Sequence, residues 1–433
     1  MCLRTEIPKL SRVMMNGLKT MNACIRAAGL VMLLLCGLVV IEGQVGLAQS
    51  PSTISIRAAR LLDGRGGVLE NAVIEITGSR ISRIDQRQGR VTYDLGDATV
   101  LPGLIDVHVH FIAGANSDQP AELRAADRAV LWQRNFRATL MAGFTTVQSV
   151  GDEPDKPVRE AISLDRYAYL GPATFIIGPR LLSSLGQVHP GDRPPDELRE
   201  EVRKLKSDGA DLIKLYGTAA GSAGPCDNSK ISSREQMAAV CGEAKIQGLR
   251  CVVHAHPPDA IINAVKGGAS EIEHGGCADD EAIKTMAEAK VFYDPTMSVV
   301  PLILAHKDEL MQTGRLDAKA LAQAEELLPV KRRIFQKALA VGLRMPNGSD
   351  IGLFPGENAT EIIARVEAGQ KPMDAIVGAT SLSAESLGLG NSIGTLAVGY
   401  EADIIAVRDN PLQEIAALRN VAFVMKGGQI YKH

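Results

Sequence analysis

The sequence predicts an α/β fold built around a (β/α)8 TIM barrel. Apolar stretches with strand character alternate with helical stretches between residues 104 and 390. Both ends of the chain consist instead of short alternating strands separated by Gly and Asp turns. Repeated strand–helix units favour a parallel sheet, and eight of them suit a closed barrel.

Eight stretches of the middle region are expected to be the barrel strands. They are residues 104–110, 145–150, 174–181, 212–217, 251–256, 271–275, 291–296 and 344–350. Helical patterns such as "PDELREEVRKLKSDGA" and "DAIINAVKGGA" separate them. The β-rich ends, residues 52–103 and the last forty residues, are expected to form a second and smaller β unit.

The first residues differ from the rest in composition. Five basic residues precede the apolar run 27–41, and small residues at Gly46 and Ala48 follow it. This order is typical of a signal peptide over residues 1–48, cleaved after Ala48. The run is shorter than the ~20 residues of a spanning helix, so an uncleaved anchor is the weaker alternative. The protein is therefore expected to be exported, most simply to the periplasm.

Composition limits the kinds of partner that the chain is expected to bind and the cysteine chemistry open to it. The formal net charge is −3, and aromatic residues make up 4% of the chain, so we expect neither nucleic acid nor an anionic membrane surface as a partner. Four cysteines follow the leader, and they allow three complete pairings as disulfides: Cys226, Cys241, Cys251 and Cys277. Buried free thiols are an equal alternative, and no CxxC motif indicates a thiolate zinc site.

Histidines gather at the ends of the expected strands. In a strand, residues i and i+2 project to the same side, so His108 and His110 point together. The carboxyl ends of barrel strands meet at one face, where the active sites of such barrels lie. The residues that would meet there are His108, His110, Lys214, His254, His256, His274 and Asp350. Imidazoles and a carboxylate in this arrangement indicate a metal site.

Lys214 is the unusual member of this set, because an ammonium would repel metal ions. Burial of an amine in an apolar strand favours its neutral form, which can react with carbon dioxide to give a carbamate. The two carbamate oxygens could bridge two metal ions. The alternative is a structural lysine paired with Asp211 or with a neighbouring strand.

The whole mature chain resembles the amidohydrolase superfamily, in its imidazolonepropionase-like branch with Xaa-Pro dipeptidases and arginine carboxypeptidase-like enzymes. The motifs that carry the resemblance are "LPGLIDVHVHF", "DLIKLYGTAAG", "VVHAHPPDAIINAVKGGASEIEHG", "NGSD" and "IGTLAVGYEADIIAV". The resemblance implies a metal-dependent hydrolase barrel over residues 104–390. It also implies a β-sandwich made from residues 49–103 and 391–433.

The resemblance further implies a binuclear site. His108, His110 and Asp350 would hold one divalent ion, most simply zinc, and His254 and His274 would hold the second. Carboxylated Lys214 and a hydroxide would bridge the two ions, with Asp350 as general base and then general acid. Spacing alone does not choose between His254 and His256, and the family pattern favours His254.

Four further residues are candidates for contacts with the substrate: Tyr216, His189, Arg180 and His256. A core tyrosine and a structural ion-pair arginine are the alternatives for Tyr216 and Arg180. Two departures from the family pattern bear on the substrate. The first is the pair of prolines in "HAHPPD", and the second is "SLGQVHPGD", where relatives often carry a glycine-histidine-glycine run.

The expected activity is hydrolysis of the C–N amide bond of dipeptides or N-acyl amino acids with a free carboxylate. A mononuclear cyclic-amide hydrolase or deaminase is the alternative among enzymes. A non-catalytic exported protein that binds metal or a small ligand is the alternative outside enzymes. The resemblance leaves assembly into a homo-oligomer open.

Overall fold

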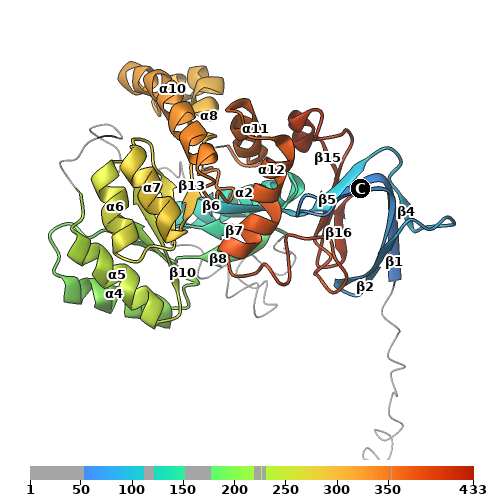
Figure 1. Cartoon of the computed structure of the whole chain (residues 1–433), viewed down its shortest axis with the longest axis horizontal. Helices are drawn as coiled ribbons and strands as arrows, with labels where there is room; N and C mark the ends of the chain where they lie inside the picture. The colour runs from blue at the N-terminus through green and yellow to red at the C-terminus, as the bar shows by residue number, and fades with distance from the viewer. Residues whose placement is uncertain (1–52, 112–120, 152–176, 219–225, 227–230, 353) are drawn as a thin grey trace, which may run out of the picture. The chain divides into compact units, whose positions relative to one another are not determined.

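The structure is a computed structural model that describes residues 53–111, 121–151, 177–218, 226, 231–352 and 354–433. The predicted leader lies outside the described residues. The described chain contains one large mixed sheet and two parallel sheets, with helices packed against them (Figure 1). Among the described residues, no helix is both long and apolar enough to span a membrane.

Both ends of the described chain build one eight-stranded mixed sheet. Its order is β16-β15-β14-β5-β1-β2-β3, with β4 beside β1. The strands are β1 (Thr53–Leu62), β2 (Val68–Thr77), β3 (Arg80–Asp85), β4 (Tyr93–Asp94), β5 (Thr99–Pro102), β14 (Ile404–Val407), β15 (Val421–Lys426) and β16 (Gln429–Lys432). The expected β-rich ends of the chain therefore lie side by side.

Apolar residues at alternate positions of this sheet form a common core. Ile56 of β1 lies opposite Ile74 of β2, and both are buried. The same core contains Ile81 of β3 and Phe423 and Met425 of β15, although β3 and β15 lie near opposite ends of the strand order. One apolar core therefore runs across the sheet from β3 to β15.

The middle of the chain forms two parallel sheets. The first has the order β6-β7-β8, and the second β13-β12-β11-β10-β9. Their strands are β6 (Leu104–Val109), β7 (Phe144–Ser149), β8 (Arg180–Ser183), β9 (Gln187–Val188), β10 (Leu212–Tyr216), β11 (Arg250–Ala255), β12 (Glu271–His274) and β13 (Phe292–Asp294). The α/β class and the parallel pairing expected from the sequence are confirmed.

Two of the expected strands differ from the structure. The strand expected at 174–181 begins only at Arg180, and residues 174–176 lie outside the described residues. Residues 344–350 form no regular strand. Arg344 makes a single parallel bridge to Phe292 of β13, and Ile351, directly after the stretch, makes one to Val109 of β6. Pro346 lacks the N–H that a regular ladder needs at its position.

The 344–351 segment nevertheless joins the two parallel sheets by hydrogen bonds. Tyr293 N donates to Arg344 O at 2.9 Å, and Val107 N donates to Asn347 O at 2.8 Å. The buried Asp106 accepts hydrogen bonds from Ser349 N at 3.0 Å and from Ser349 Oγ at 2.5 Å. Burial raises the pKa of Asp106 and these hydrogen bonds lower it. Burial has the larger effect, and the resulting pKa is about 6. The segment is thereby fixed beside β6.

Helices cover the parallel strands (Figure 1). They are α2 (Ala121–Met141), α4 (Pro195–Ser207), α5 (Arg234–Ile246), α6 (Pro258–Lys266), α7 (Asp280–Ala289), α8 (Val299–Ala305), α9 (Lys307–Gln312), α10 (Ala318–Ala340), α11 (Ala359–Glu367), α12 (Pro372–Val377) and α13 (Ser383–Ser386). A π-helical turn, η2 (Gly378–Leu382), and a 3-10 turn, η3 (Ile415–Arg419), complete the set.

Local sequence explains where several helices begin. Ser233 and Gln236 form a reciprocal capping box at the start of α5, and Asp279 caps α7. Pro258 occupies the first turn of α6 directly after Pro257, a position where a missing N–H costs nothing. The two prolines that depart from the family pattern therefore start this helix two residues after His256.

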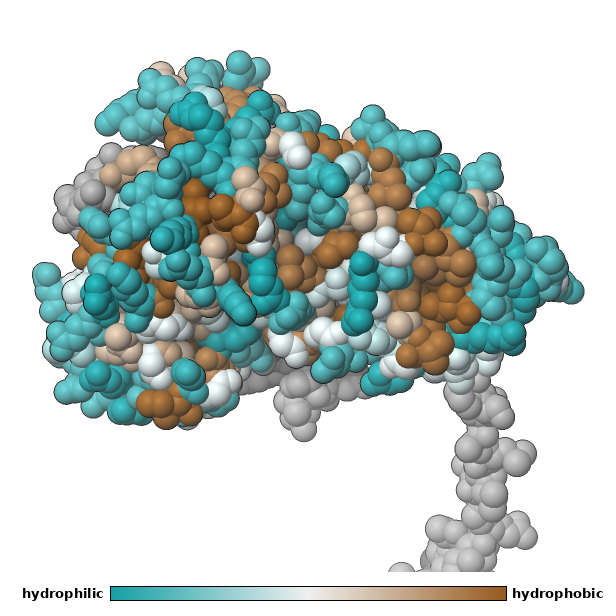
Figure 2. Space-filling view, viewed as in Figure 1, coloured by the Kyte–Doolittle hydropathy of each residue, from teal (hydrophilic) through white to brown (hydrophobic). Residues whose placement is uncertain are grey.

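The longest described helix, α10, has two different sides. Its buried residues include Lys331, Ile334 and Phe335, and Pro329 interrupts its hydrogen bonding. The surface over α8 and α10 is mostly hydrophilic in Figure 2, with apolar side chains between the hydrophilic ones. One side of α10 therefore packs inward while the other faces solvent.

The four cysteines of the described residues form two disulfides, Cys226–Cys277 and Cys241–Cys251. The Cα–Cα distances are 5.6 and 5.2 Å. The alternative that these four cysteines are buried free thiols is therefore wrong. Cys241 lies in α5 and Cys251 in β11, so the shorter bridge ties a helix to the strand that it covers.

Candidate metal centre

The ends of β6, β10, β11 and β12 meet around one cavity of about 210 Å³. Its lining residues are His108, His110, Lys214, Tyr216, His254, His256, His274, Thr296, Val299, Val300, Leu327, Lys331 and Asp350. The structure therefore brings together all six residues predicted as metal ligands. A cavity of this size is smaller than sites for drug-sized ligands and suits a small substrate.

One group of candidate ligands comes from β6 and the 344–351 segment. His108 Nε2 and His110 Nε2 each lie 3.4 Å from Asp350 Oδ1. Asp350 N donates to His108 O at 2.8 Å, so a backbone hydrogen bond sets the carboxylate beside the two rings. Two imidazoles and one carboxylate that converge in this way could hold a divalent ion.

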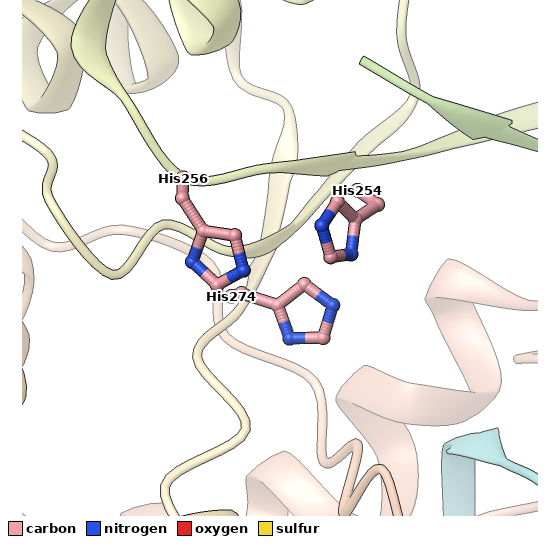
Figure 3. Close-up of side chains that lie close together, drawn as sticks. All are labelled: His254, His256 and His274. Carbon is pink, nitrogen blue, oxygen red and sulfur yellow. The ribbon is translucent and has the colours of Figure 1, made fainter. Parts of the chain in front are cut away.

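A second group comes from β11 and β12. The rings of His254, His256 and His274 face one another in Figure 3, and one nitrogen from each lies within 4.8 Å of the others. His108 and His274 lie side by side, with ring centroids 5.1 Å apart. Asp350 Oδ2 is 3.9 Å from His274 Nδ1. The carboxylate of Asp350 thus lies between the two groups.

The electrostatics of these rings suit metal binding. Burial lowers the pKa of His108, His254 and His274 well below the usual value, and it lowers that of His256 to about 3. The rings are therefore neutral at pH 7, as metal ligation requires. His254 Nε2 and His256 Nδ1 are buried without a hydrogen-bond partner among the described residues. Such atoms are costly unless something binds them, so the residues present fit a metal centre.

Hydrogen bonds behind the rings fix their orientation. His108 Nδ1 lies 3.0 Å from Asp294 Oδ2, and His274 Nδ1 lies 2.9 Å from Thr296 Oγ1. Asp294 is the last residue of β13, and Thr296 follows it two residues later. A carboxylate or hydroxyl behind a histidine sets its tautomer and its angle, which strengthens metal binding.

The backbone is strained at the same place. His274, Thr296 and Asp350 have φ of 67°, 45° and 52°. The left-handed region is uncommon for residues other than Gly and is unusual for a β-branched residue such as Thr296. Strain of this kind persists where the surroundings hold it, and it gathers at functional sites.

Lys214 is fully buried and lines the same cavity as both groups of rings. Its Nζ contacts Oε2 of Glu273, which comes from β12, two strands away in the sheet. Glu273 Oε1 is 3.5 Å from His108 Nδ1. The partner of Lys214 in this structure is therefore Glu273, and Asp211 instead accepts a hydrogen bond from Ser183 N at 2.8 Å.

Two of the candidate substrate contacts form a stack at the cavity. The Tyr216 ring lies between those of His189 and His254, with centroid distances of 4.3 and 4.6 Å. Burial raises the pKa of Tyr216 to about 12, so its hydroxyl stays protonated and can donate. His189 is exposed and does not line the cavity. His256 lines it beside the ligand candidates.

Arg180 lies away from the cavity. It begins β8, and its guanidinium pairs with Glu401 near the end of the chain. Carboxyl ends of parallel strands form the site, so a residue at the first position of a strand faces the opposite end. Arg180 therefore forms a structural ion pair, which is the alternative that the sequence left open.

Sequence reasoning missed Glu273, Asp294, Thr296 and Lys331. Glu273 could have been found, because it alternates with Glu271 along one side of the buried strand "EIEH". Asp294 and Thr296 follow the same period in "YDPT". Lys331 gave no such signal, because three consecutive basic residues in "PVKRR" are typical of a solvent-exposed stretch.

Comparison with known proteins decides the family. Residues 99–431 match the amidohydrolase family. The chain belongs to the amidohydrolase family. This confirms the resemblance seen in the sequence, and it makes the protein a hydrolase that acts on carbon–nitrogen bonds. Members of this family are metal-dependent, in agreement with the ligand groups above.

Three similar proteins illustrate the range of this amidohydrolase family. The chain is 28% identical over 422 residues to an ochratoxinase of Aspergillus niger, covering 87% of this chain and 86% of that protein. A solved Xaa-Pro dipeptidase with bound methionine is 30% identical with a TM-score of 0.77, covering 88% and 100%. A prolidase complexed with N-methylphosphonate-L-proline is 25% identical with a TM-score of 0.75, covering 88% and 100%.

Proposed function

We propose that this amidohydrolase is an exported binuclear enzyme that cleaves the amide bond of dipeptides or N-acyl amino acids. The observation that carries the proposal is the pair of adjacent ligand groups with Asp350 between them. The group of His108, His110 and Asp350 would hold one ion. His254 and His274 would hold the other, with His256 as a further nitrogen nearby.

Lys214 supports the binuclear form of the proposal. It is buried at the cavity that both groups line, and a carbamate on its Nζ would present two oxygens there in place of the contact with Glu273. Zinc suits a mixed set of nitrogen and oxygen ligands. A mononuclear cyclic-amide hydrolase or deaminase would not need this lysine at the cavity.

The residues of the chain would divide the chemistry among them. Bound divalent ions would lower the pKa of water and polarise the scissile carbonyl. Asp350 reaches both ligand groups, so its carboxylate can take the proton from the attacking water and deliver it to the leaving nitrogen. The protonated Tyr216 hydroxyl would donate to the developing oxyanion or to a substrate carboxylate.

Named relatives support the substrate class. Prolidases and Xaa-Pro dipeptidases are named for the cleavage of dipeptides, and an ochratoxinase is named for a toxin. We propose substrates with an amino-acid carboxylate next to the scissile amide. The departure at "HAHPPD" lies at the site, and that at "SLGQVHPGD" reaches its edge where His189 stacks on Tyr216; both would adjust the choice of side chain.

The test is metal content followed by hydrolysis on one preparation. About two metals per chain, with release of a free amino acid from dipeptides or N-acyl amino acids, would support the proposal. About one metal without amide turnover would favour the mononuclear alternative. Bound metal without turnover of any amide, cyclic amide or amine substrate would favour the non-catalytic protein.

The proposal includes architecture and export. Hydrogen bonds through the 344–351 segment favour closure of the two parallel sheets into one (β/α)8 barrel, and the shared core of β1–β3 and β15 favours a β-sandwich. The domain boundaries predicted above and cleavage after Ala48 stay predictions. Mass spectrometry of the protein from a bacterial periplasm would test the latter, with Gln49 expected as the first residue.

A further inference from the structure

One wall of the cavity differs in chemistry from the metal-ligand side. Val299 and Val300 of α8 and Leu327 and Lys331 of α10 form it. Leu327 and Lys331 are four residues apart and therefore lie on the same side of the helix. The wall is aliphatic with one ammonium group. Among the described lining residues the only other ammonium is that of Lys214, which contacts Glu273.

Hydrogen bonds hold the Lys331 ammonium close to the candidate metal centre. Nζ donates to Thr296 O at 2.7 Å and to Thr296 Oγ1 at 3.3 Å. Thr296 Oγ1 in turn lies 2.9 Å from His274 Nδ1. Nζ therefore lies within two hydrogen-bond lengths of a candidate ligand. An ammonium has three N–H donors, and Thr296 accepts from two of them.

The ammonium of Lys331 forms no ion pair with any carboxylate among the described residues. The residue is 7% exposed, and no described carboxylate forms an ion pair with it within 4.0 Å, although Asp294, Asp350 and Glu361 lie in its neighbourhood. A buried cation is costly unless it is paired. A lining cation in this situation is suited to an anion that arrives with the substrate.

We propose that Lys331 binds the free carboxylate of the substrate, while Val299, Val300 and Leu327 contact its aliphatic side chain. This inference rests on the proposed amide hydrolysis. In a dipeptide or N-acyl amino acid the carboxylate carbon is three bonds from the scissile carbonyl carbon, about 3–4 Å away. A carboxylate held by Lys331 would therefore keep the amide beside His274 and Asp350. Lys331 would select acids over the corresponding amides.

A binding experiment on the metal-loaded protein tests this without turnover. The probes are 4-methylpentanoate and its carboxamide, measured by calorimetry with wild type, Lys331→Met and Lys331→Arg. We expect wild type to prefer the acid, and Lys331→Met to lose roughly 10- to 100-fold of acid affinity with amide affinity unchanged, as for a hydrogen bond to a charged group. Lys331→Arg keeps a cation and should keep the preference.

Arg332→Met is the matched control, because it removes a neighbouring cation whose side chain is 45% exposed. It should leave acid binding unchanged. Equal binding of acid and amide by wild type would overturn the proposal even if Lys331→Met fails to fold. A loss of bound metal in Lys331→Met without an acid-specific loss would also overturn it, since Lys331 would then act only through Thr296.

Hydrolysis separates this proposal from the one on which it rests. With N-acetyl-L-leucine as substrate, Lys331→Met should raise KM at least tenfold with little change in kcat. N-acetyl-L-leucinamide should show no such change. Absence of amide hydrolysis by wild type would count against the proposed function, while the calorimetry would still decide whether Lys331 binds carboxylates.

Discussion

Asp294 Oδ2 lies 3.0 Å from His108 Nδ1, so a buried carboxylate from β13 orients a candidate ligand from β6 across 186 residues of sequence. Asp294→Asn keeps the size of the side chain and replaces its carboxyl group with an amide. We expect metal affinity to fall by roughly 10- to 100-fold. Competition with a fluorescent chelator measures it, and Asp280→Asn on the surface of α7 is the control. Unchanged affinity would show that Asp294 does not support the metal.

A substitution of Lys214 tests whether this residue is a bridging metal ligand or a structural lysine. If Lys214 is the proposed bridging ligand, Lys214→Ala should abolish turnover and reduce bound metal from about two ions to about one or none. Elemental analysis and hydrolysis of the same sample measure both. The exposed Lys337→Ala is the control. Full metal content in the Lys214 variant would mean that the lysine serves only to pair Glu273.

Gly348 lies against the Asp294 carboxylate, where a Cβ would overlap it. Gly348→Ala should displace that carboxylate, lower metal affinity and lower the melting temperature. Gly242→Ala in α5 is the matched control, since a Cβ there meets nothing within 4 Å. It should stabilise the protein by about 0.5–1 kcal/mol. Normal metal binding by the Gly348 variant would contradict this account of the contact.

The two disulfides should differ in their effect on stability. Their sequence separations are 51 and 10 residues, and the loop-entropy argument gives about 4 and about 3 kcal/mol of stabilisation. Cys226→Ser with Cys277→Ser should therefore lower the free energy of unfolding more than Cys241→Ser with Cys251→Ser. Urea unfolding of both double variants measures this, and the reverse order would contradict it.

Residues whose position at the cavity follows from strand period were predictable. His108, His110, His254 and His274 end buried strands, and parallel strands bring such ends together whatever their separation in the chain. Lys214 was predictable as buried for the same reason. Its contact with Glu273 was not, because that residue belongs to β12, and a single sequence does not show which side chains reach across a sheet.

Residues whose role depends on irregular backbone or on a helix were not predictable. Thr296 reaches the site through left-handed backbone, which no pattern of apolar residues signals; Asp350 shares this conformation but was predicted, because a strand was expected to end there. Lys331 faces the cavity from a helix whose other side is solvated, so charge alone did not reveal its burial. The cysteine pairs were equally open, since spacing permits every combination.

The 344–351 segment completes the candidate site, and it is translated late, after most of the chain. Asp350 meets His108 through a backbone hydrogen bond, and Ser349 meets Asp106 across 243 residues. A ribosome must therefore complete most of the chain before the first histidine pair gains its carboxylate. Until then His108 and His110 lack the third member of their ligand group, so this part of the candidate site is completed only when the chain is nearly whole.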